Sequence, residues 1–313
     1  GDASNPGITW MSRMSGFKIQ DPGQNLGPLP SAAWSKLGNI QDFEISRETP
    51  MGCAADGSTA VLVDEDPGSN DVHEVLDQVR SLKHVDDSSV KTGITLKNLC
   101  ITGFFHESTG LDVHFSHFKK LDLSGNAIGG TLELGDVEDW ASLEELALAN
   151  NRLEGELPSI LDNLPMLRRL DVSGNAFTGA ILNEWSAGCV LRELDLTDNN
   201  MNGTWPENLA QCGSLQTLKL SNNALSGAIS AGFFDNLGLR AVHIDNQIGK
   251  GGGLAGPLPA GLFEMQRPFG TLEELKLSDN LFTGSLPAVQ TAMAGVCVSR
   301  YCPGQVPAGP IGD

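Results

Sequence analysis

A fixed period of about 24 residues constrains this chain more than any other feature. Five consecutive segments each begin with a leucine and follow one pattern, from LDLSGNAIGGTL to LKLSNNALSGAI. Their first leucines lie 25, 24, 24 and 24 residues apart, at Leu121, Leu146, Leu170, Leu194 and Leu218. Such a period is typical of a solenoid, in which each unit buries its apolar face against its neighbours.

Each repeat is expected to open with a short strand. Leu194 and Leu196 share the inner face, while Asp195 between them points outward. An asparagine follows each strand, and a buried amide can pair with the backbone of adjacent turns. We therefore predict an asparagine ladder at Asn126, Asn151, Asn175, Asn199, Asn223 and Asn280. Four residues further on, a glycine such as Gly155 permits backbone angles that a β-carbon would forbid.

These columns resemble the leucine-rich repeat of the plant-specific subtype, LxxLxLxxNxLxGxLPxxLxxL. The match is closest at Asn151, Leu153, Gly155, Leu157, Pro158, Leu161 and Leu164. The resemblance implies an α/β repeat solenoid, a right-handed horseshoe or superhelix with a parallel β-sheet on its concave face. It also implies a recognition role, usually outside the cell.

We predict one solenoid of about ten repeats over residues 1–296, followed by a C-terminal cap and Pro/Gly tail at 297–313. Its predicted parts are irregular repeats (1–45), an acidic insertion (46–95), regular repeats (96–240), a bulged repeat (241–272) and a last repeat (273–296). In the bulged repeat the segment QIGKGGG, Gln247 to Gly253, replaces the ladder asparagine by Gln247. Its glycines are costly to order, so we expect no rigid surface there without a partner.

The net charge of −19 and the pI near 4.6 argue against binding to nucleic acid or to an anionic membrane. They favour solubility or a basic partner. Six cysteines fit an oxidised, exported protein. We expect Cys53 to pair with Cys100 and Cys297 with Cys302, while Cys189 and Cys212 either pair or stay as buried thiols.

Asn202, followed by Gly203 and Thr204, is a glycosylation candidate. We expect an extracellular or cell-surface location, with a signal peptide removed before Gly1. No apolar run approaches the roughly 20 residues of a membrane span.

The sequence predicts no enzyme, no cofactor and no metal site, because no catalytic fingerprint occurs. VDEDPGSND lacks the spacing of an EF-hand, and His114 and His117 lack a third ligand. Asp171 and Asp195 are expected on adjacent strands about 4.8 Å apart, but an open sheet encloses no active site. The candidate ligand-binding residues are Asp122, Asp171, Asp195, Lys219, His243 and Lys276 in the outward row of the strands, and Lys250 in the bulge.

We therefore predict an extracellular module that binds another protein, a glycan or a basic surface non-covalently, through its concave face and inserted loops. The first alternative is a structural subunit of a cell-surface layer or filament that binds copies of itself. The second is an inhibitor of a secreted wall-degrading enzyme. Ice binding would need a regular threonine array, which is not the pattern of the row Thr131, Glu156, Ala180, Thr204, Ala228, Pro257 and Ser285.

Overall fold

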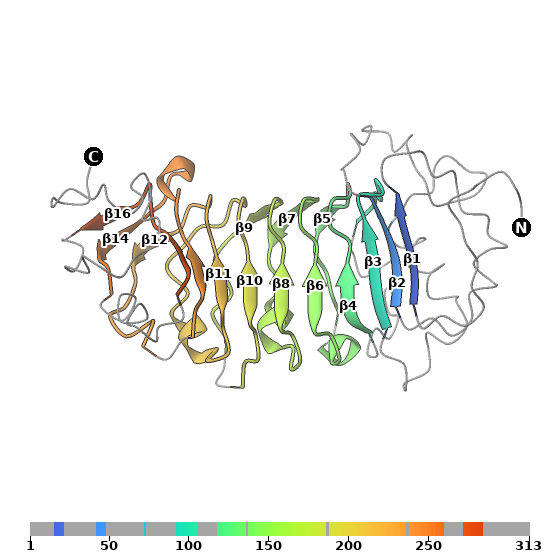
Figure 1. The fold of residues 1–313 in the computed structure, drawn as a ribbon. Coiled ribbons are helices and arrows are strands. Elements are labelled where there is room, and N and C mark those ends of the chain that lie inside the picture. The colour runs from blue at the N-terminus through green and yellow to red at the C-terminus, as the bar shows by residue number, and fades with distance from the viewer. Residues whose placement is uncertain are drawn as a thin grey trace, which may run out of the picture.

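A computed structural model of the chain shows the expected solenoid, with one long parallel sheet along the stack (Figure 1). It describes residues 16–21, 42–47, 72, 92–104, 118–135, 137–185, 188–235, 238–259 and 272–283. The prediction of a parallel-strand repeat solenoid is confirmed. The ten strands of the long sheet, in their order along it, are β1 (Gly16–Asp21), β2 (Asp42–Arg47), β3 (Thr92–Lys97), β4 (Phe118–Asp122), β6 (Glu145–Ala147), β8 (Arg169–Asp171), β10 (Glu193–Asp195), β11 (Thr217–Lys219), β13 (Ala241–His243) and β15 (Glu274–Lys276).

The strands pair in register, so equivalent residues of successive repeats lie side by side. Leu170 lies opposite Leu194, and Leu194 opposite Leu218. All three are at most 1% exposed. Because side chains alternate across a strand, the residues between the leucines form the outward face of the sheet.

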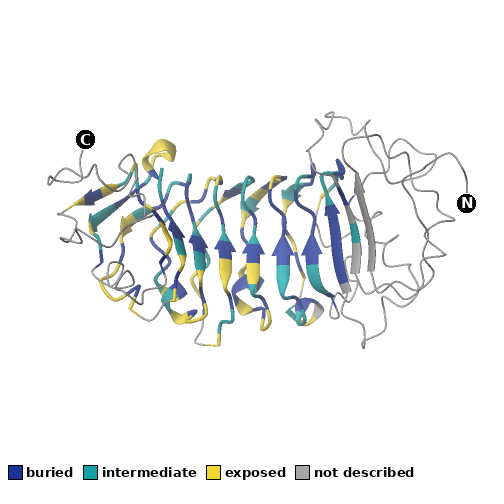
Figure 2. Ribbon diagram, in the orientation of Figure 1, coloured by how far each residue is buried: buried dark blue, intermediate teal, exposed yellow. Residues whose placement is uncertain are grey.

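The core is one cluster of leucines and other apolar side chains that, apart from Val72, extends from Ile94 to Phe282. Buried residues recur in every described repeat along the ribbon (Figure 2). Burying one leucine completely stabilises the fold by roughly 1.5–3 kcal/mol. Each of these side chains contacts neighbouring repeats, so no repeat can bury its own apolar face alone. The spacing of the leucines is therefore what fixes the solenoid.

A second row of short strands runs beside the long sheet. It consists of one sheet with β5 (Gly129–Thr131), β7 (Arg152–Glu156) and β9 (Ala176–Thr178), and another with β12 (Ser226–Ala228), β14 (Gly253–Pro257) and β16 (Leu281–Thr283). Single bridges such as Thr204 to Ser226 continue the row between them. We call this row the flank. Gly155 in β7 has φ +81°, and a Cβ added there would lie 2.9 Å from Thr131 Cγ2.

Four short 3-10 helices complete the named elements in the described part of the chain. They are η3 (Val137–Trp140), η4 (Ser159–Asn163), η5 (Glu207–Gln211) and η6 (Ile248–Lys250).

Buried or half-buried side-chain amides link each repeat from Asn126 onward to the one before it. Asn199 Nδ2 donates to Val172 O of the preceding repeat and to Leu196 O of its own, at 3.0 and 3.1 Å. Its Oδ1 accepts from Phe177 N at 3.0 Å. The same two-way pairing is made by Asn126, Asn151, Asn175, Asn223 and Asn280. An aspartate could accept the backbone N–H but could not donate to the carbonyls.

Gln247 takes the ladder position in the bulged repeat. Its Oε1 accepts from Leu225 N at 3.0 Å, and its Nε2 donates to Leu220 O at 2.8 Å. Gln247 is fully buried. The longer side chain therefore keeps the ladder intact where the chain bulges.

The interruption in the repeats is shorter than the range 46–95 predicted for the acidic insertion. Strand β2 continues to Arg47, and β3 begins at Thr92. Phe43 pairs with Ile94, and Ile94 with Leu121. The predicted resumption at Leu96 is therefore two residues late, because Ile94 already occupies the inward position of the strand.

Several predictions concern residues outside the described part of the chain. They are the pairing of Cys53 and of Cys297 with Cys302, the acidic loop, His114, His117, and the tail with its boundary at 296. Cys100 is disulfide-bonded, and the prediction that Cys53 is its partner stays a prediction.

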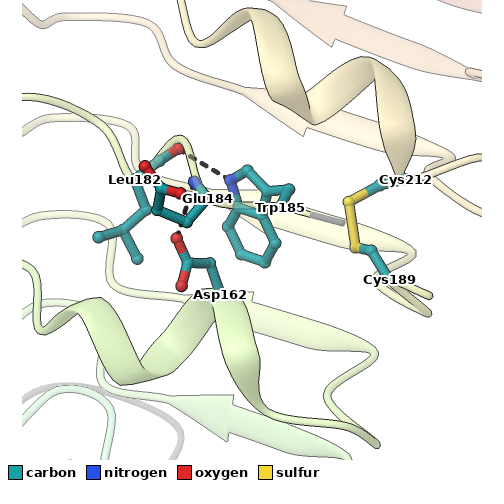
Figure 3. The surroundings of a disulfide bond; sticks show 6 residues. All are labelled: Asp162, Leu182, Glu184, Trp185, Cys189 and Cys212. Atoms are coloured by element: carbon teal, nitrogen blue, oxygen red, sulfur yellow. Dashed lines mark hydrogen bonds between the residues drawn. A yellow bond between two sulfur atoms is a disulfide. The ribbon is translucent and has the colours of Figure 1, made fainter. Parts of the chain in front are cut away.

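A disulfide joins Cys189 to Cys212 across adjacent repeats (Figure 3). The sequence alone was compatible either with this bond or with two buried thiols. Beside the bond, Trp185 Nε1 donates to Leu182 O at 2.8 Å. The carboxylate of Asp162 in η4 accepts from the backbone N of Glu184 at 3.0 Å. Asp162 is 8% exposed, and desolvation by burial raises the pKa of its carboxyl group.

Candidate ligand-binding face

The outward side chains of the long sheet form an ordered polar surface, which we call the sheet face. The register brings six predicted residues into one row with Ala147. In order along the stack, the row is Asp122, Ala147, Asp171, Asp195, Lys219, His243 and Lys276. Lys250, the seventh candidate, lies in η6, outside the strands of the sheet.

Ion pairs between neighbouring strands hold much of this face in place. Arg169 contacts Glu145, Asp171 and Glu193 at 3.9, 3.3 and 3.6 Å. Lys219 pairs with Asp195 at 3.2 Å. Each exposed pair contributes little to stability, about 0–1 kcal/mol. Their combined effect is to restrict the side chains, which reduces the entropy lost when a partner binds.

Asp171 and Asp195 lie on paired strands, as the spacing predicted, but they do not form a carboxylate dyad. Asp171 accepts from Ser173 N and Ser173 Oγ, at 3.2 and 2.7 Å, and pairs with Arg169. Asp195 accepts from Thr197 N and pairs with Lys219. Each carboxylate therefore has its own cation and its own hydrogen-bond donor, an arrangement unlike two acids that share a proton.

His243 is the most sheltered titratable side chain at the C-terminal end of the row, since only 8% of the residue is exposed. Its Nε2 lies 2.8 Å from Glu274 Oε2. Burial lowers the pKa of His243 from its ordinary value of 6.5, and the nearby charge of Lys276 lowers it further, against the opposing effect of Glu274.

A hollow of about 750 Å³ lies on the sheet face across β3, β4, β6 and β8. It forms because Ala147 and Ala149 stand where the neighbouring repeats carry Asp and Ser. Charged side chains surround this small apolar floor: Lys97, Asp122, Arg152, Arg169 and Asp171. Lys97 Nζ lies 3.4 Å from Asp122 Oδ2. The hollow was not predicted, although the alanine at position 147 is visible in the sequence as the one small apolar residue of the row.

The bulge from Gln247 to Gly253 is anchored, contrary to the expectation that its glycines need a partner to become ordered. Lys250 Nζ donates to Asn199 O at 3.0 Å and to Asn200 Oδ1 at 2.9 Å, about two repeats earlier in the chain. A Cβ on Gly252 would lie 2.3 Å from the backbone carbonyl carbon of Ala224. The glycines therefore let the loop pack closely onto the preceding repeat. Lys250 remains exposed, but its ammonium group already has acceptors.

A column of residues with left-handed backbone conformation lies just before the ladder positions, and it was not predicted from the sequence. Asn150, Asp198, Asn222 and Asn246 have φ between 55° and 57°, and Gly125 and Gly174 also have positive φ. Asn222 Nδ2 donates to Asp198 Oδ1 at 2.6 Å, and Asn246 Nδ2 donates to Asn222 Oδ1. The signal was present, because only Asn, Asp and Gly readily adopt this conformation.

The glycosylation candidate Asn202 lies on the flank. Asn202 and Thr204 are both exposed, while Met201, the residue before Asn202, is fully buried in the core. Asn202 pairs with Ala180 in an isolated bridge. The sequon is thus open to solvent and belongs to a different surface from the sheet face.

Within the residues described, no group of three or more His, Cys, Asp or Glu side chains is arranged to hold a metal ion. In the same part of the chain, no helix is both long and apolar enough to cross a bilayer.

Comparison with known families identifies the repeats. A family profile described as "Leucine Rich Repeat" matches residues 142–164, 190–212 and 214–236. A second, described as "Leucine Rich repeat", matches residues 116–131 and 163–182. A curated relative, receptor-like protein kinase 7 of Arabidopsis thaliana, is 39% identical over 61 residues, which are 20% of this chain and 6% of that protein.

Two solved structures share the fold over most of this chain. One is the LRR ectodomain of the plant membrane receptor kinase GASSHO1/SCHENGEN3 from Arabidopsis thaliana in complex with CASPARIAN STRIP INTEGRITY FACTOR 2 (TM-score 0.59, 20% identity, 86% of this chain and 33% of that one). The other is a plant ice-binding protein (TM-score 0.58, 18% identity, 86% of this chain and 73% of that one). This chain thus spans about a third of the receptor ectodomain. These two proteins have similar TM-scores but different functions. The structural similarity therefore establishes the fold of this chain, and its function has to be argued from the binding surface.

Proposed function

We propose that this chain, whose central repeats are leucine-rich repeats of the plant-specific type, is an extracellular module that binds another protein non-covalently through its sheet face. The observation that carries the proposal is the row from Asp122 to Lys276, in which outward polar side chains lie in register and are held by ion pairs. A surface ordered before binding loses little entropy on contact. The hollow over Ala147 adds shape to an otherwise open sheet.

The extracellular location is part of the proposal. The disulfide between Cys189 and Cys212 fits an oxidising compartment. Asn202 would be accessible to a glycosylating enzyme. Receptor ectodomains with this fold support the same location. Peptide mapping of the protein from its native source, before and after glycosidase treatment, tests whether Asn202 carries a glycan.

The flank is the less suitable binding surface for ice. Its exposed row includes the charged Glu156 beside Ala180, Thr204 and Ala228, so hydroxyl and methyl groups do not repeat regularly. A charged side chain interrupts a flat array of small groups. We therefore place binding on the sheet face.

The binding surface can be tested with two matched arginine substitutions. Thr217→Arg places a long side chain on the sheet face between β10 and β13, where Thr217 is half-buried. Ala228→Arg places the same side chain on the flank, where Ala228 is exposed. Both proteins should fold, which circular dichroism and melting curves check.

Each protein is then used to capture partners from native extracellular extract, alongside the unsubstituted chain. The proposal expects a protein that is retained by the parent chain and by Ala228→Arg but lost with Thr217→Arg. Loss of that protein with Ala228→Arg, together with its retention by Thr217→Arg, would indicate that the flank is the binding surface. Retention of only further copies of this chain would support the surface-layer alternative instead.

A further inference from the structure

Ala147 interrupts the charge pattern of the sheet face. A second row of outward side chains lies two residues earlier on each strand. Its charges alternate in sign along β4, β6, β8 and β10, at Lys120, Glu145, Arg169 and Glu193. Adjacent members form ion pairs at 3.4, 3.9 and 3.6 Å. In the row of Ala147, Asp122 and Asp171 lie on the strands to either side. The central position thus has a carboxylate on both sides and no charge of its own.

The cations that neutralise these two carboxylates come from other directions. Lys97 reaches Asp122 from β3, which lies on the side away from β6. Arg169 reaches Asp171 from β8 itself. Strand β6 and the residues after it up to Asn150 contain no basic side chain. With strands about 4.8 Å apart, both carboxylates are within reach of a group bound above Ala147.

We propose that the hollow over Ala147 is a subsite for one basic side chain, lysine or arginine, of a partner polypeptide. That side chain occupies the hollow above Ala147 and Ala149, which are 3% and 6% exposed, and its charged end lies between Asp122 and Asp171. The cation completes the alternation of charge in this row. The net charge of −19 attracts such a partner from a distance.

The basic residues around the hollow differ in how strongly they repel a cationic side chain. Arg169 is surrounded by Glu145, Asp171 and Glu193, so its charge is balanced. Arg152 is exposed at the hollow and has no ion pair among the described residues. It therefore repels a cationic occupant and would attract an anionic one, which makes Arg152 a useful probe of the sign of the ligand.

The inference deepens the proposed function and is tested without the natural partner. The probe is the capped peptide acetyl-Gly-Gly-Arg-Gly-Gly-amide, with a citrulline peptide as its uncharged counterpart and a glutamate peptide as its anionic one. The full chain carries ¹³C-methyl alanine, and the peptide is titrated while the methyl signals are followed. The arginine peptide should shift Ala147 and Ala149 but not Ala241 on β13, and the citrulline peptide should bind at least about fivefold more weakly.

Three substitutions sharpen the test. Asp171→Asn should weaken the arginine peptide at least about fivefold, while keeping an acceptor for Ser173. Asp195→Asn is the matched control, because Asp195 makes equivalent contacts with Thr197 and Lys219 but lies one strand further from Ala147. It should change the affinity less than twofold. Arg152→Gln should strengthen binding of the arginine peptide by removing a like charge.

Preferential binding of the glutamate peptide, with loss of that binding in Arg152→Gln, would overturn the assignment in favour of an anionic group. Equal binding of the arginine and citrulline peptides would also overturn it. These results do not depend on whether the Thr217→Arg protein loses its partner. Failure of the subsite and failure of the sheet face as a binding surface are therefore distinguishable.

Discussion

Gln247 makes the backbone contacts that Asn223 makes one repeat earlier. Asn223 Nδ2 donates to Leu196 O at 2.9 Å, and Gln247 Nε2 donates to Leu220 O at 2.8 Å. Each side-chain oxygen accepts from a backbone N at 3.0 Å, that of Met201 or of Leu225. The ladder therefore depends on a buried primary amide at this place, and the bulged repeat supplies it from a side chain one methylene longer.

Removal of either amide should destabilise the protein to a similar extent. Gln247→Ala and Asn223→Ala each leave a buried N–H and at least one buried carbonyl without a partner, so we expect a loss of about 1–3 kcal/mol in the free energy of unfolding. Urea denaturation measures it. Gln216→Ala, at an exposed position, serves as the control and should change the free energy by less than about 0.5 kcal/mol. An equal effect at all three positions would show that the ladder contributes nothing specific.

Removal of the disulfide should cost more than removal of any one ladder amide. Cys189 and Cys212 are 23 residues apart in sequence. Closing a loop of that size restricts the unfolded chain and stabilises the fold by about 3 kcal/mol. The double variant Cys189→Ala, Cys212→Ala avoids reducing Cys100 and isolates this bond. Denaturation of parent and variant under non-reducing conditions gives the difference, and coincident curves would mean that the link is redundant.

His243 should make the protein more stable at neutral pH than in mild acid. Because the pKa of His243 is lowered on folding, the unfolded chain binds a proton more readily than the folded chain. The stability contributed is present above the ordinary pKa of 6.5 and is lost as the pH falls from there through the folded pKa. The difference in unfolding free energy between the parent and His243→Gln should therefore decrease from pH 8 to pH 5. A constant difference over that range would contradict this expectation.

Asp162 should show the opposite dependence. Burial raises its pKa above the ordinary value of 3.8, so the stability contributed by protonated Asp162 is present below 3.8 and is lost as the pH rises through the folded pKa. Asp162→Asn keeps an oxygen acceptor for Glu184 N without a charge. Relative to the parent, this variant should gain stability between pH 3.5 and pH 7. Thermal melts at both values compare the two proteins, and a relative loss at neutral pH would show that the carboxylate charge is needed there.

Lys250 should hold the bulge in place without contributing much to global stability. Lys250→Met keeps most of the aliphatic chain but removes the donor to Asn199 and Asn200. We expect faster amide hydrogen exchange at Gly251 to Gly253 and a change of less than about 1 kcal/mol in unfolding free energy. Lys276→Met, at an exposed position on β15, is the control. Unchanged exchange in the bulge would assign its order to the glycine packing alone.

The sequence predicted the features that depend only on the period. Once Leu121 and Leu218 were aligned, the row from Asp122 to Lys276 and the ladder positions followed, because equivalent residues of a solenoid lie side by side. The sequence did not predict contacts that depend on side-chain conformation. The contact of Lys250 with Asn199 spans about two repeats, and the neutralisation of Asp171 by Arg169 depends on rotamers. The start of β3 at Thr92 was missed because the preceding insertion removed the register that located the strands of the long sheet from Leu121 onward. The short strands of the flank were not predicted.

The left-handed column implies a rule about which repeats can follow one another. A Cβ on Gly125 would lie 1.7 Å from Asn98 Oδ1, and a Cβ on Gly174 would lie 2.5 Å from Asn150 Oδ1. In the N-terminal half of the column, asparagine and glycine therefore alternate, and each asparagine leans over the glycine of the next unit. Further along the column, Asp198 and Asn222 are neighbours, and Asn222 donates a hydrogen bond to Asp198. A repeat whose asparagine leans over the next unit must therefore be followed by a glycine repeat, whereas a repeat whose side chain hydrogen-bonds along the column can be followed by another asparagine.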